Sequence, residues 1–137
     1  MRIVLDTNCL LVIVPKQSQF RIIFDSIING KLNLVVTTEM LLEYEEQLSI
    51  FYSTEYAKLI ISAICNLPNT IQVNTIYFNW LLISADLDDN KFIDAYIAGQ
   101  ADYLITNDKH FKDLSKVEFP KVICVKLKDF VNFKYSN

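Results

Sequence analysis

Hydrophobic residues in this chain fall into short apolar runs that alternate with longer segments in which they recur every three or four positions. Short runs of β-prone residues are typical of buried strands, whereas the longer spacing is typical of amphipathic helices. The predicted strands are Ile3–Leu5, Lys31–Val36, Ile71–Ile76, Tyr103–Thr106 and Lys121–Val125. The predicted helices are Ser18–Asn29, Glu39–Ile50, one from Ser53 or Thr54 to about Cys65, one opened by residues 86–90, and Lys128–Phe133, with helical turns at Asn79–Ser84 and Lys109–Ser115.

Strands that alternate with helices predict βαβ units, a parallel sheet and right-handed crossovers that place helices on both faces. The 137 residues match the size of one domain, and a hydrophobic content of 52% is enough to form a core. With only 2 Gly and 3 Pro, the composition disfavours a disordered or linker-rich chain. We therefore expect a single α/β domain that spans residues 1–137.

Composition excludes several classes of protein. No apolar run approaches the roughly 18 residues of a membrane span, and Asp6 and Asn8 interrupt what would be the hydrophobic region of a signal peptide. Three cysteines without C-x-x-C spacing favour a reduced, cytoplasmic protein, and the single histidine excludes a His-rich zinc site. The net charge of −3 disfavours binding of nucleic acid through a basic surface alone. It is compatible with phosphate binding through metal ions held by carboxylates.

Acidic residues lie where predicted strands end and where predicted helices begin. Asp6 ends the first strand, Glu43 lies one turn into the helix after the second, and Asp108 follows the fourth. Asp89 lies in the first turn of the helix before the fourth strand. Because these positions share one edge of a doubly wound sheet, we expect the four acids to converge. Two carboxylates about 4 Å apart repel by about 4 kcal/mol at an effective dielectric constant of 20, so such a group requires a cation. Oxygen ligands suit Mg²⁺ or Mn²⁺, and the pattern indicates metal-assisted phosphodiester hydrolysis.

Each acid also has a structural alternative. Aspartate is a favoured N-cap, and that alternative applies to Asp6, Asp88, Asp89 and Asp108. Glu43 has the alternative of a solvated helix face, and Asp86 and Asp94 are interpreted as surface or capping residues. The metal-site hypothesis therefore depends on the convergence of several acids and on no single one.

Other residues near this edge are interpreted as structural. His110 is taken as a turn residue rather than a phosphate contact, because one histidine cannot supply the chemistry of the site. Solvated positions are favoured over RNA contacts for Lys91, Lys109 and Lys112. Core packing is favoured over base stacking or a partner groove for Tyr77, Phe78 and Trp80.

Four blocks of sequence, in order, resemble the PIN-domain nucleases. The first is Leu5-Asp6-Thr7-Asn8, and the second is Thr37–Leu48 with Glu43 in its acidic position. The third is the Asp-rich run Asp86–Asp89 with the following Asn-Lys-Phe, and the fourth is Ala101–Phe111. Each block alone is a weak signal, but four in the family's order span nearly the whole chain. The subgroup that they resemble contains VapC-type toxins of toxin–antitoxin pairs.

The resemblance implies a three-layer α/β/α sandwich with a parallel sheet of four to five strands and a Mg²⁺- or Mn²⁺-dependent endoribonuclease. Its acidic residues, which would bind metal and catalyse cleavage, are Asp6, Glu43, Asp89 and Asp108. The supporting residues would be Thr7, Asn8 and Thr106, with Asp88 as the alternative to Asp89 in the third acidic position and Glu39 as a neighbour of Glu43. A homodimer, an RNA substrate and an antitoxin partner are further implications of the resemblance.

Three other functions compete with this reading. A PIN-like domain without catalysis would bind RNA or serve as a scaffold, and it would not need all four acids together. A phosphatase with an aspartyl nucleophile typically has a second Asp shortly after the first, but Asp6 is followed by Thr7 and Asn8. A DNA nuclease would use the same acids, because the site suits either phosphodiester backbone.

Overall fold

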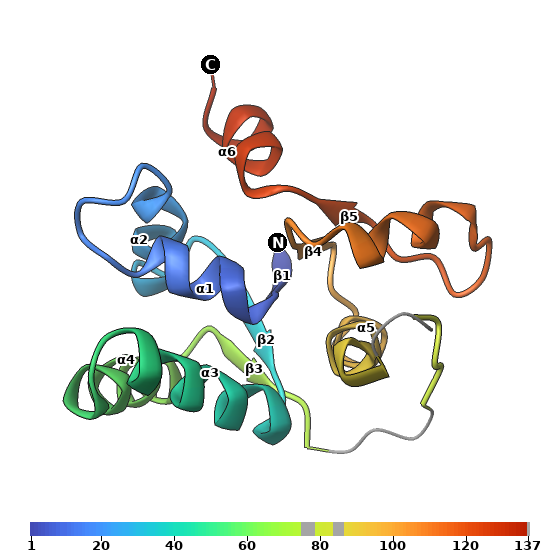
Figure 1. Cartoon of the computed structure of the whole chain (residues 1–137). Helices are drawn as coiled ribbons and strands as arrows, with labels where there is room; N and C mark the ends of the chain where they lie inside the picture. The colour runs from blue at the N-terminus through green and yellow to red at the C-terminus, as the bar shows by residue number, and fades with distance from the viewer. Residues whose placement is uncertain (75–78, 84–86, 137) are drawn as a thin grey trace.

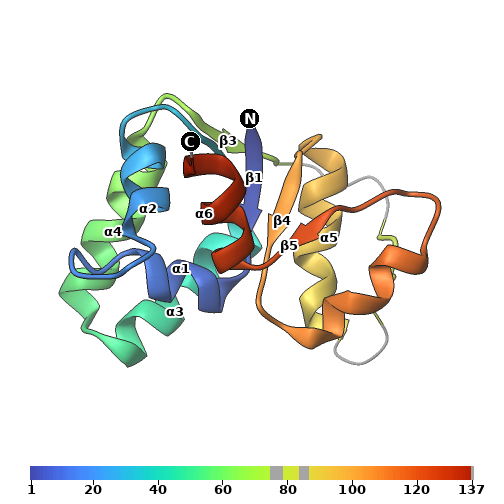
Figure 2. The ribbon, with the colours of Figure 1, turned by 90° about the horizontal axis from the view of Figure 1, so that it is seen from above.

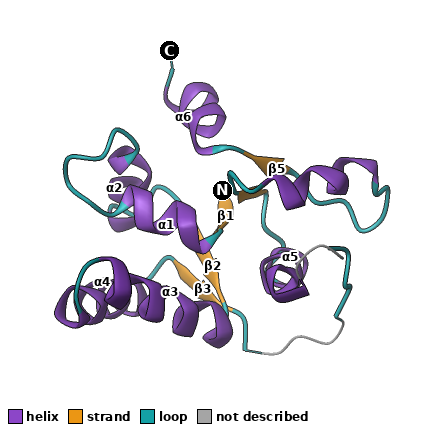
Figure 3. Ribbon diagram, viewed as in Figure 1, coloured by secondary structure: helices purple, strands orange, loops and turns teal. Residues whose placement is uncertain are grey.

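Five parallel strands form one sheet in the order β3-β2-β1-β4-β5 (Figures 1 and 3). The structure is a computed structural model, and it describes residues 1–74, 79–83 and 87–136. The strands are β1 (Arg2–Leu5), β2 (Asn33–Val36), β3 (Thr70–Gln72), β4 (Tyr103–Ile105) and β5 (Cys124–Val125). The α-helices are α1 (Thr7–Ile13), α2 (Arg21–Ile28), α3 (Thr38–Phe51), α4 (Thr54–Asn66), α5 (Asn90–Ala98) and α6 (Leu127–Tyr135). Two 3₁₀ segments are η1 (Leu87–Asp89) and η2 (Lys109–Lys116).

Helices cover both faces of the sheet, which makes three layers. Figures 1 and 2 show α1 to α4 and α6 on one side of the strands, with α5 and η2 on the other side. The chain runs outward from β1 to β3 and then returns past β1 to β4. The strand order therefore reverses between β1 and β4, and the carboxyl ends of these two strands flank the position where ligands bind in such folds. The predicted α/β/α sandwich with a parallel sheet is confirmed.

The central strands form the middle of the core. Ile3, Val4 and Leu5 of β1 are completely buried, as a strand covered on both faces requires. Tyr44 of α3 is also buried, and its hydroxyl donates a 2.5 Å hydrogen bond to the carbonyl of Leu5. This bond ties α3 to the end of β1, where the site lies.

Two glycines are required by geometry. Gly30 ends α2 with φ +77°, a conformation that L side chains rarely adopt. Gly99 follows α5, and a Cβ atom there would lie 2.5 Å from a methyl carbon of Val35 in β2. The absence of a side chain at Gly99 lets the end of α5 pack closely on the sheet.

Apart from the exact bounds of elements, two parts of the chain differ from the predictions. Residues 7–13 form α1, where only a turn had been expected. Residues 79–83 have no regular secondary structure, so the predicted helical turn is wrong there, and Leu81 has φ +51°. Side chains of α5 hold this segment instead: Asn90 forms 2.8 Å hydrogen bonds with both the N–H and the carbonyl of Ile83, and Asp94 accepts one of 3.1 Å from the Trp80 N–H. Ile76 and Ser84, the ends of two predicted elements, lie outside the described residues.

Candidate functional site

Asp6 and Thr106 lie side by side where β1 and β4 end. These strands pair in register up to Leu5 and Ile105, so the next residue of each strand enters the same space. The Thr106 hydroxyl donates a 2.8 Å hydrogen bond to Asp6 Oδ2 and accepts one of 3.0 Å from the Asp108 N–H. Asp6 occupies the N-cap position of α1, but its side chain forms no capping hydrogen bond there. The carboxylate is therefore held by Thr106, the residue that follows β4, and it does not serve as a side-chain cap of α1.

The electrostatic environment of Asp6 disfavours its charge. The residue is only 6% exposed, and burial raises its pKa above the ordinary value, with Asp108 and Glu43 adding repulsion. The hydrogen bond from Thr106 acts in the opposite direction but is a smaller effect than burial. A cation between these carboxylates would remove the repulsion, which makes this part of the fold a candidate metal site.

The raised pKa of Asp6 predicts how stability depends on pH without metal. Below 3.8, the ordinary pKa of an aspartate, Asp6 is protonated in both the folded and the unfolded chain. Above that pH, the folded chain keeps a proton on Asp6 that the unfolded chain has released. The stability that this proton contributes therefore decreases with rising pH and is lost as the pH passes the raised pKa. We expect the melting temperature in EDTA to fall with rising pH more for the wild type than for Asp6→Asn. Equal slopes from pH 4 to pH 7 would contradict the repulsion inferred at Asp6.

Glu43 is held from two sides. The Thr7 hydroxyl donates a hydrogen bond to Glu43 Oε2, and Lys91 Nζ forms an ion pair of 2.8 Å with Glu43 Oε1. Lys91 also pairs with Asp88 Oδ2 at 2.9 Å and donates to the Asp88 carbonyl at 3.0 Å. Glu43 thus lies at the site together with Thr7, whereas Glu39 is exposed one turn earlier on α3.

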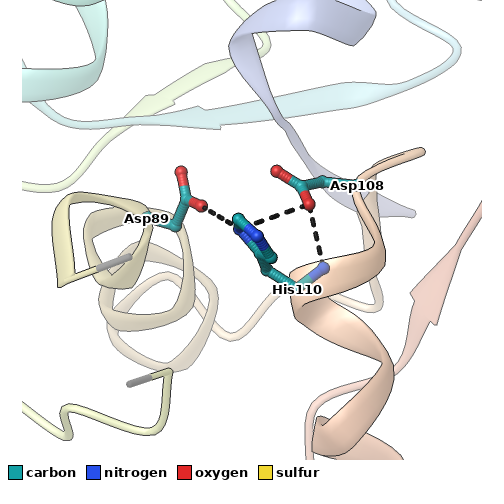
Figure 4. A group of neighbouring side chains, drawn as sticks. All are labelled: Asp89, Asp108 and His110. Carbon is teal, nitrogen blue, oxygen red and sulfur yellow. Dashed lines mark hydrogen bonds and ion pairs between the residues drawn. The ribbon is translucent and has the colours of Figure 1, made fainter. Parts of the chain in front are cut away.

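Asp89, Asp108 and His110 form a second group beside Asp6 (Figure 4). His110 Nδ1 lies 3.6 Å from Asp89 Oδ2 and 3.4 Å from Asp108 Oδ1. Asp108 also caps η2, because its Oδ1 accepts a 2.9 Å hydrogen bond from the His110 N–H. Asp89 precedes α5 but forms no side-chain cap. Of Asp6, Asp89 and Asp108, only Asp108 caps a helical segment, and that cap leaves its carboxylate beside Asp89.

These side chains fit a divalent cation. One ligand atom from each of Asp89, Asp108 and His110 lies within 4.8 Å of the other two. The Nδ1 atom of His110 is buried and has no hydrogen-bond partner among the described residues, although it faces two carboxylates. Carboxylate oxygens are the ligands that Mg²⁺ and Mn²⁺ prefer, and a single imidazole nitrogen is compatible with Mn²⁺.

The structure leaves some predicted residues away from this cluster. Asn8 is exposed and lines a different hollow, between α1 and the end of α3. Asp94, which was expected to be a surface or capping residue, lies inside α5, where it is buried and bonded to the Trp80 backbone, so that expectation is wrong. Asp86 lies outside the described residues.

One of the expectations for neighbouring residues is wrong in a way that matters for the site, because Lys91 is buried among acids rather than solvated. His110 lies in the first turn of η2, and its ring also faces the carboxylates of Asp89 and Asp108. Trp80 is half-buried and packs edge-to-face against the exposed Phe119. Tyr77 and Phe78 lie outside the described residues.

A groove of about 530 Å³ adjoins the acids at the carboxyl ends of β4 and β5. Asp108 and Thr106 are among the residues that line it, so the groove adjoins the candidate metal site. Four exposed lysines also line it: Lys109, Lys112, Lys121 and Lys126. Positive charge next to a cluster of carboxylates is the arrangement that a phosphate-bearing substrate and its metal ion require.

The fold and the cluster define an α/β protein with acidic side chains gathered where its strand order reverses. Residues 2–110 match the family model of the PIN domain, and the chain therefore belongs to the PIN domain family. A solved structure is similar over 92% of this chain and 98% of its own, with 18% identity and a TM-score of 0.61. It is a chain of the crystal structure of VapBC2 from Rickettsia felis bound to a DNA fragment from their promoter, and at this identity the likeness is one of fold. A comparison with curated proteins gives no match. In the described part of the chain, no helix is long and apolar enough to cross a membrane.

Proposed function

We propose that this protein is a divalent-metal-dependent endoribonuclease and the toxin of a toxin–antitoxin pair. The observation that carries the proposal is the convergence of Asp6, Glu43, Asp89 and Asp108 at the edge where β1 and β4 end. These residues come from four distant segments, and bound cations would relieve their mutual repulsion. A structural function explains one capping aspartate but does not explain all four acids in one place.

The chain's own residues have distinct roles in this proposal. Asp6, Asp89 and Asp108 would hold Mg²⁺ or Mn²⁺, and Thr106 fixes Asp6 through its hydroxyl. A bound divalent ion supplies positive charge that offsets the charge developing on the phosphodiester. Glu43, held by Thr7 and Lys91, would bind the metal or orient the attacking water. Asp88, which pairs with Lys91, remains a supporting residue of the site, whereas Asn8 lies away from it and is given no part in the proposal.

RNA is the proposed substrate. The lysines of the groove support a nucleic-acid substrate, because their positive charges suit a chain of phosphates. Lys112 and Lys121 are exposed and line the same groove as Asp108. An RNA strand that follows the groove would bring a phosphodiester to the carboxylates, and cytoplasmic RNA is accessible to a protein of this class. The groove does not distinguish RNA from single-stranded DNA, because both present phosphates.

Charge reversal in this groove is expected to weaken RNA binding. Lys112→Glu should lower affinity about 5- to 10-fold at low salt and reduce the slope of log K against log salt by about 0.7 to 0.9. Lys58→Glu, at an exposed position of α4, changes the net charge by the same amount and should leave the affinity nearly unchanged. Fluorescence anisotropy with a labelled RNA in Ca²⁺ or EDTA measures the affinity and its salt dependence for both variants. The same loss in both variants would assign the effect to net charge and not to the groove.

A protein partner is proposed from a separate surface. Exposed apolar side chains of α1, α3 and α4 surround two adjoining hollows that share Pro15 and Tyr52: these are Val12, Phe51 and Leu59. An exposed apolar patch of this kind favours coverage by another chain. The similar structure is a VapBC2 complex, and by analogy we propose an antitoxin, with a homodimer as the second occupant of apolar surface.

Cleavage of RNA by the purified protein tests the proposal. Wild type and Asp6→Asn, prepared in the same way, are compared with Mn²⁺, Mg²⁺ or EDTA. Cleavage that needs metal and Asp6 supports the nuclease. Binding of RNA without cleavage, and without any dependence on Asp6, would favour the alternative of a non-catalytic RNA-binding or scaffold domain.

A further inference from the structure

Lys91 is the most unusual charged residue in the described part of the chain. It lies in the first turn of α5 and is 8% exposed, although lysine is seldom buried. The amino end of a helix repels a positive charge, so this position is unfavourable for an ammonium group by itself. Glu43 and Asp88 offset that cost, with carboxylate oxygens 2.8 and 2.9 Å from Nζ.

The ammonium group of Lys91 has three protons and three oxygen partners. Glu43 Oε1, Asp88 Oδ2 and the Asp88 carbonyl lie at 2.8, 2.9 and 3.0 Å from Nζ. A lysine that reached for a substrate phosphate would need at least one donor directed outward. Lys91 is therefore arranged to hold the acids in place, and its charge is fixed within the site.

Positive charge is distributed unevenly across the site. Lys91 neutralises the side formed by Glu43 and Asp88. Within the described residues, Asp6 and Asp108 form no ion pair with a lysine or arginine. Burial is the main reason that the pKa of Asp6 is raised, and the charge of Asp108 adds to it. A divalent ion is needed at Asp6 and Asp108 but not at Glu43, whose two oxygens already accept from Lys91 and Thr7.

We propose that the Lys91 ammonium group is a built-in cation that takes the place of a second divalent ion, so that the site binds one divalent ion, beside Asp6 and Asp108. This inference rests on the proposed function and specifies its site. Lys91 is a positioning residue that keeps Glu43 and Asp88 away from metal coordination. Glu43 accordingly orients water or substrate and is not a metal ligand.

Calorimetric titration with Mn²⁺ tests the inference through stoichiometry, a readout that is independent of activity. Wild type is expected to bind one Mn²⁺ per chain. Lys91→Met keeps the apolar stem but removes the charge, so Glu43 and Asp88 become available and two Mn²⁺ per chain are expected. Lys109→Met removes an exposed charge at the same edge and should still bind one. Two ions in the wild type, or one ion in a folded Lys91→Met, would overturn the inference.

A second variant keeps the test decisive if Lys91→Met does not fold, which thermal melting followed by circular dichroism will show. Glu43→Gln should still bind one Mn²⁺, with affinity within about threefold of wild type, because Glu43 is not a ligand. Loss of Mn²⁺ binding in Glu43→Gln would overturn the inference. The proposed function fails separately: a wild type that binds two Mn²⁺ and cleaves RNA contradicts only the role of Lys91, whereas one that neither binds Mn²⁺ nor cleaves contradicts both.

Discussion

Asp6→Asn is expected to abolish metal-dependent cleavage while making the folded protein more stable. Asp6 is nearly inaccessible, and burial together with Asp108 and Glu43 raises its pKa, so its charge is unfavourable in the folded chain without metal. Asparagine keeps an oxygen that can accept the Thr106 hydroxyl and removes the charge. The rate should fall about 10³-fold, which corresponds to about 4 kcal/mol of transition-state stabilisation. The melting temperature in EDTA at pH 7 should rise.

The opposite effects on activity, which falls, and on stability, which rises, distinguish a functional acid from a structural one. A carboxylate that served only to support the fold would lower stability when replaced, and any loss of activity would follow from unfolding. Single-turnover cleavage and calorimetric melting on the same preparations measure both quantities. An Asp6→Asn protein that melts lower than wild type and cleaves at the wild-type rate is incompatible with the site.

Mn²⁺ is expected to stabilise the wild type strongly. An ion that binds the folded chain at 100 times its dissociation constant adds about 2.7 kcal/mol, which corresponds to a rise of about 8 °C for a domain of this size. The rise should largely disappear in Asp6→Asn, because the ion loses a ligand and the repulsion that it relieves. Glu39→Gln, an exposed acid one turn before Glu43 on α3, should retain the full rise. Equal shifts in all three proteins would indicate that Mn²⁺ binds elsewhere.

The strand ends and the acids that follow them were predictable because they depend on local patterns. A short β-prone run that ends in an acid fixes where Asp6 lies, and parallel strands bring their carboxyl ends to one edge. The pairing of β1 with β4 then places Thr106 against Asp6 without further information. The same reasoning identified the segments that supply Glu43, Asp89 and Asp108.

The acidic surroundings of Lys91 and His110 were not predicted, because they come from distant parts of the chain. The spacing of Asp88 and Lys91 is compatible with an ion pair across one helical turn, but many such pairs are solvated. The second ion pair, with Glu43, is what the local spacing does not predict, because the approach of Glu43 to Lys91 depends on how α3 and α5 pack. His110 similarly faces Asp89 only because η2 and η1 meet at the same edge.

The secondary structure of segment 79–83 was also mispredicted because it depends on contacts with another part of the chain. Its apolar sequence suggested a helical turn, but its backbone hydrogen bonds go to the side chains of Asn90 and Asp94. Both side chains are buried in α5, and that burial is not visible in a local pattern. The bonds from α5 offset the loss of helical hydrogen bonds, so tertiary contacts decide the conformation.

The most direct test of the central claim is cleavage of a structured RNA and of a single-stranded DNA by the wild type with Mg²⁺, Mn²⁺ or EDTA. The account predicts cleavage of RNA in either metal and none in EDTA, and the rate on DNA relative to RNA measures the substrate preference. Asp6→Asn from the same purification controls for contaminating nucleases. RNA cleavage that persists in EDTA, or that is equal in the variant, would contradict a metal-dependent site built on these acids.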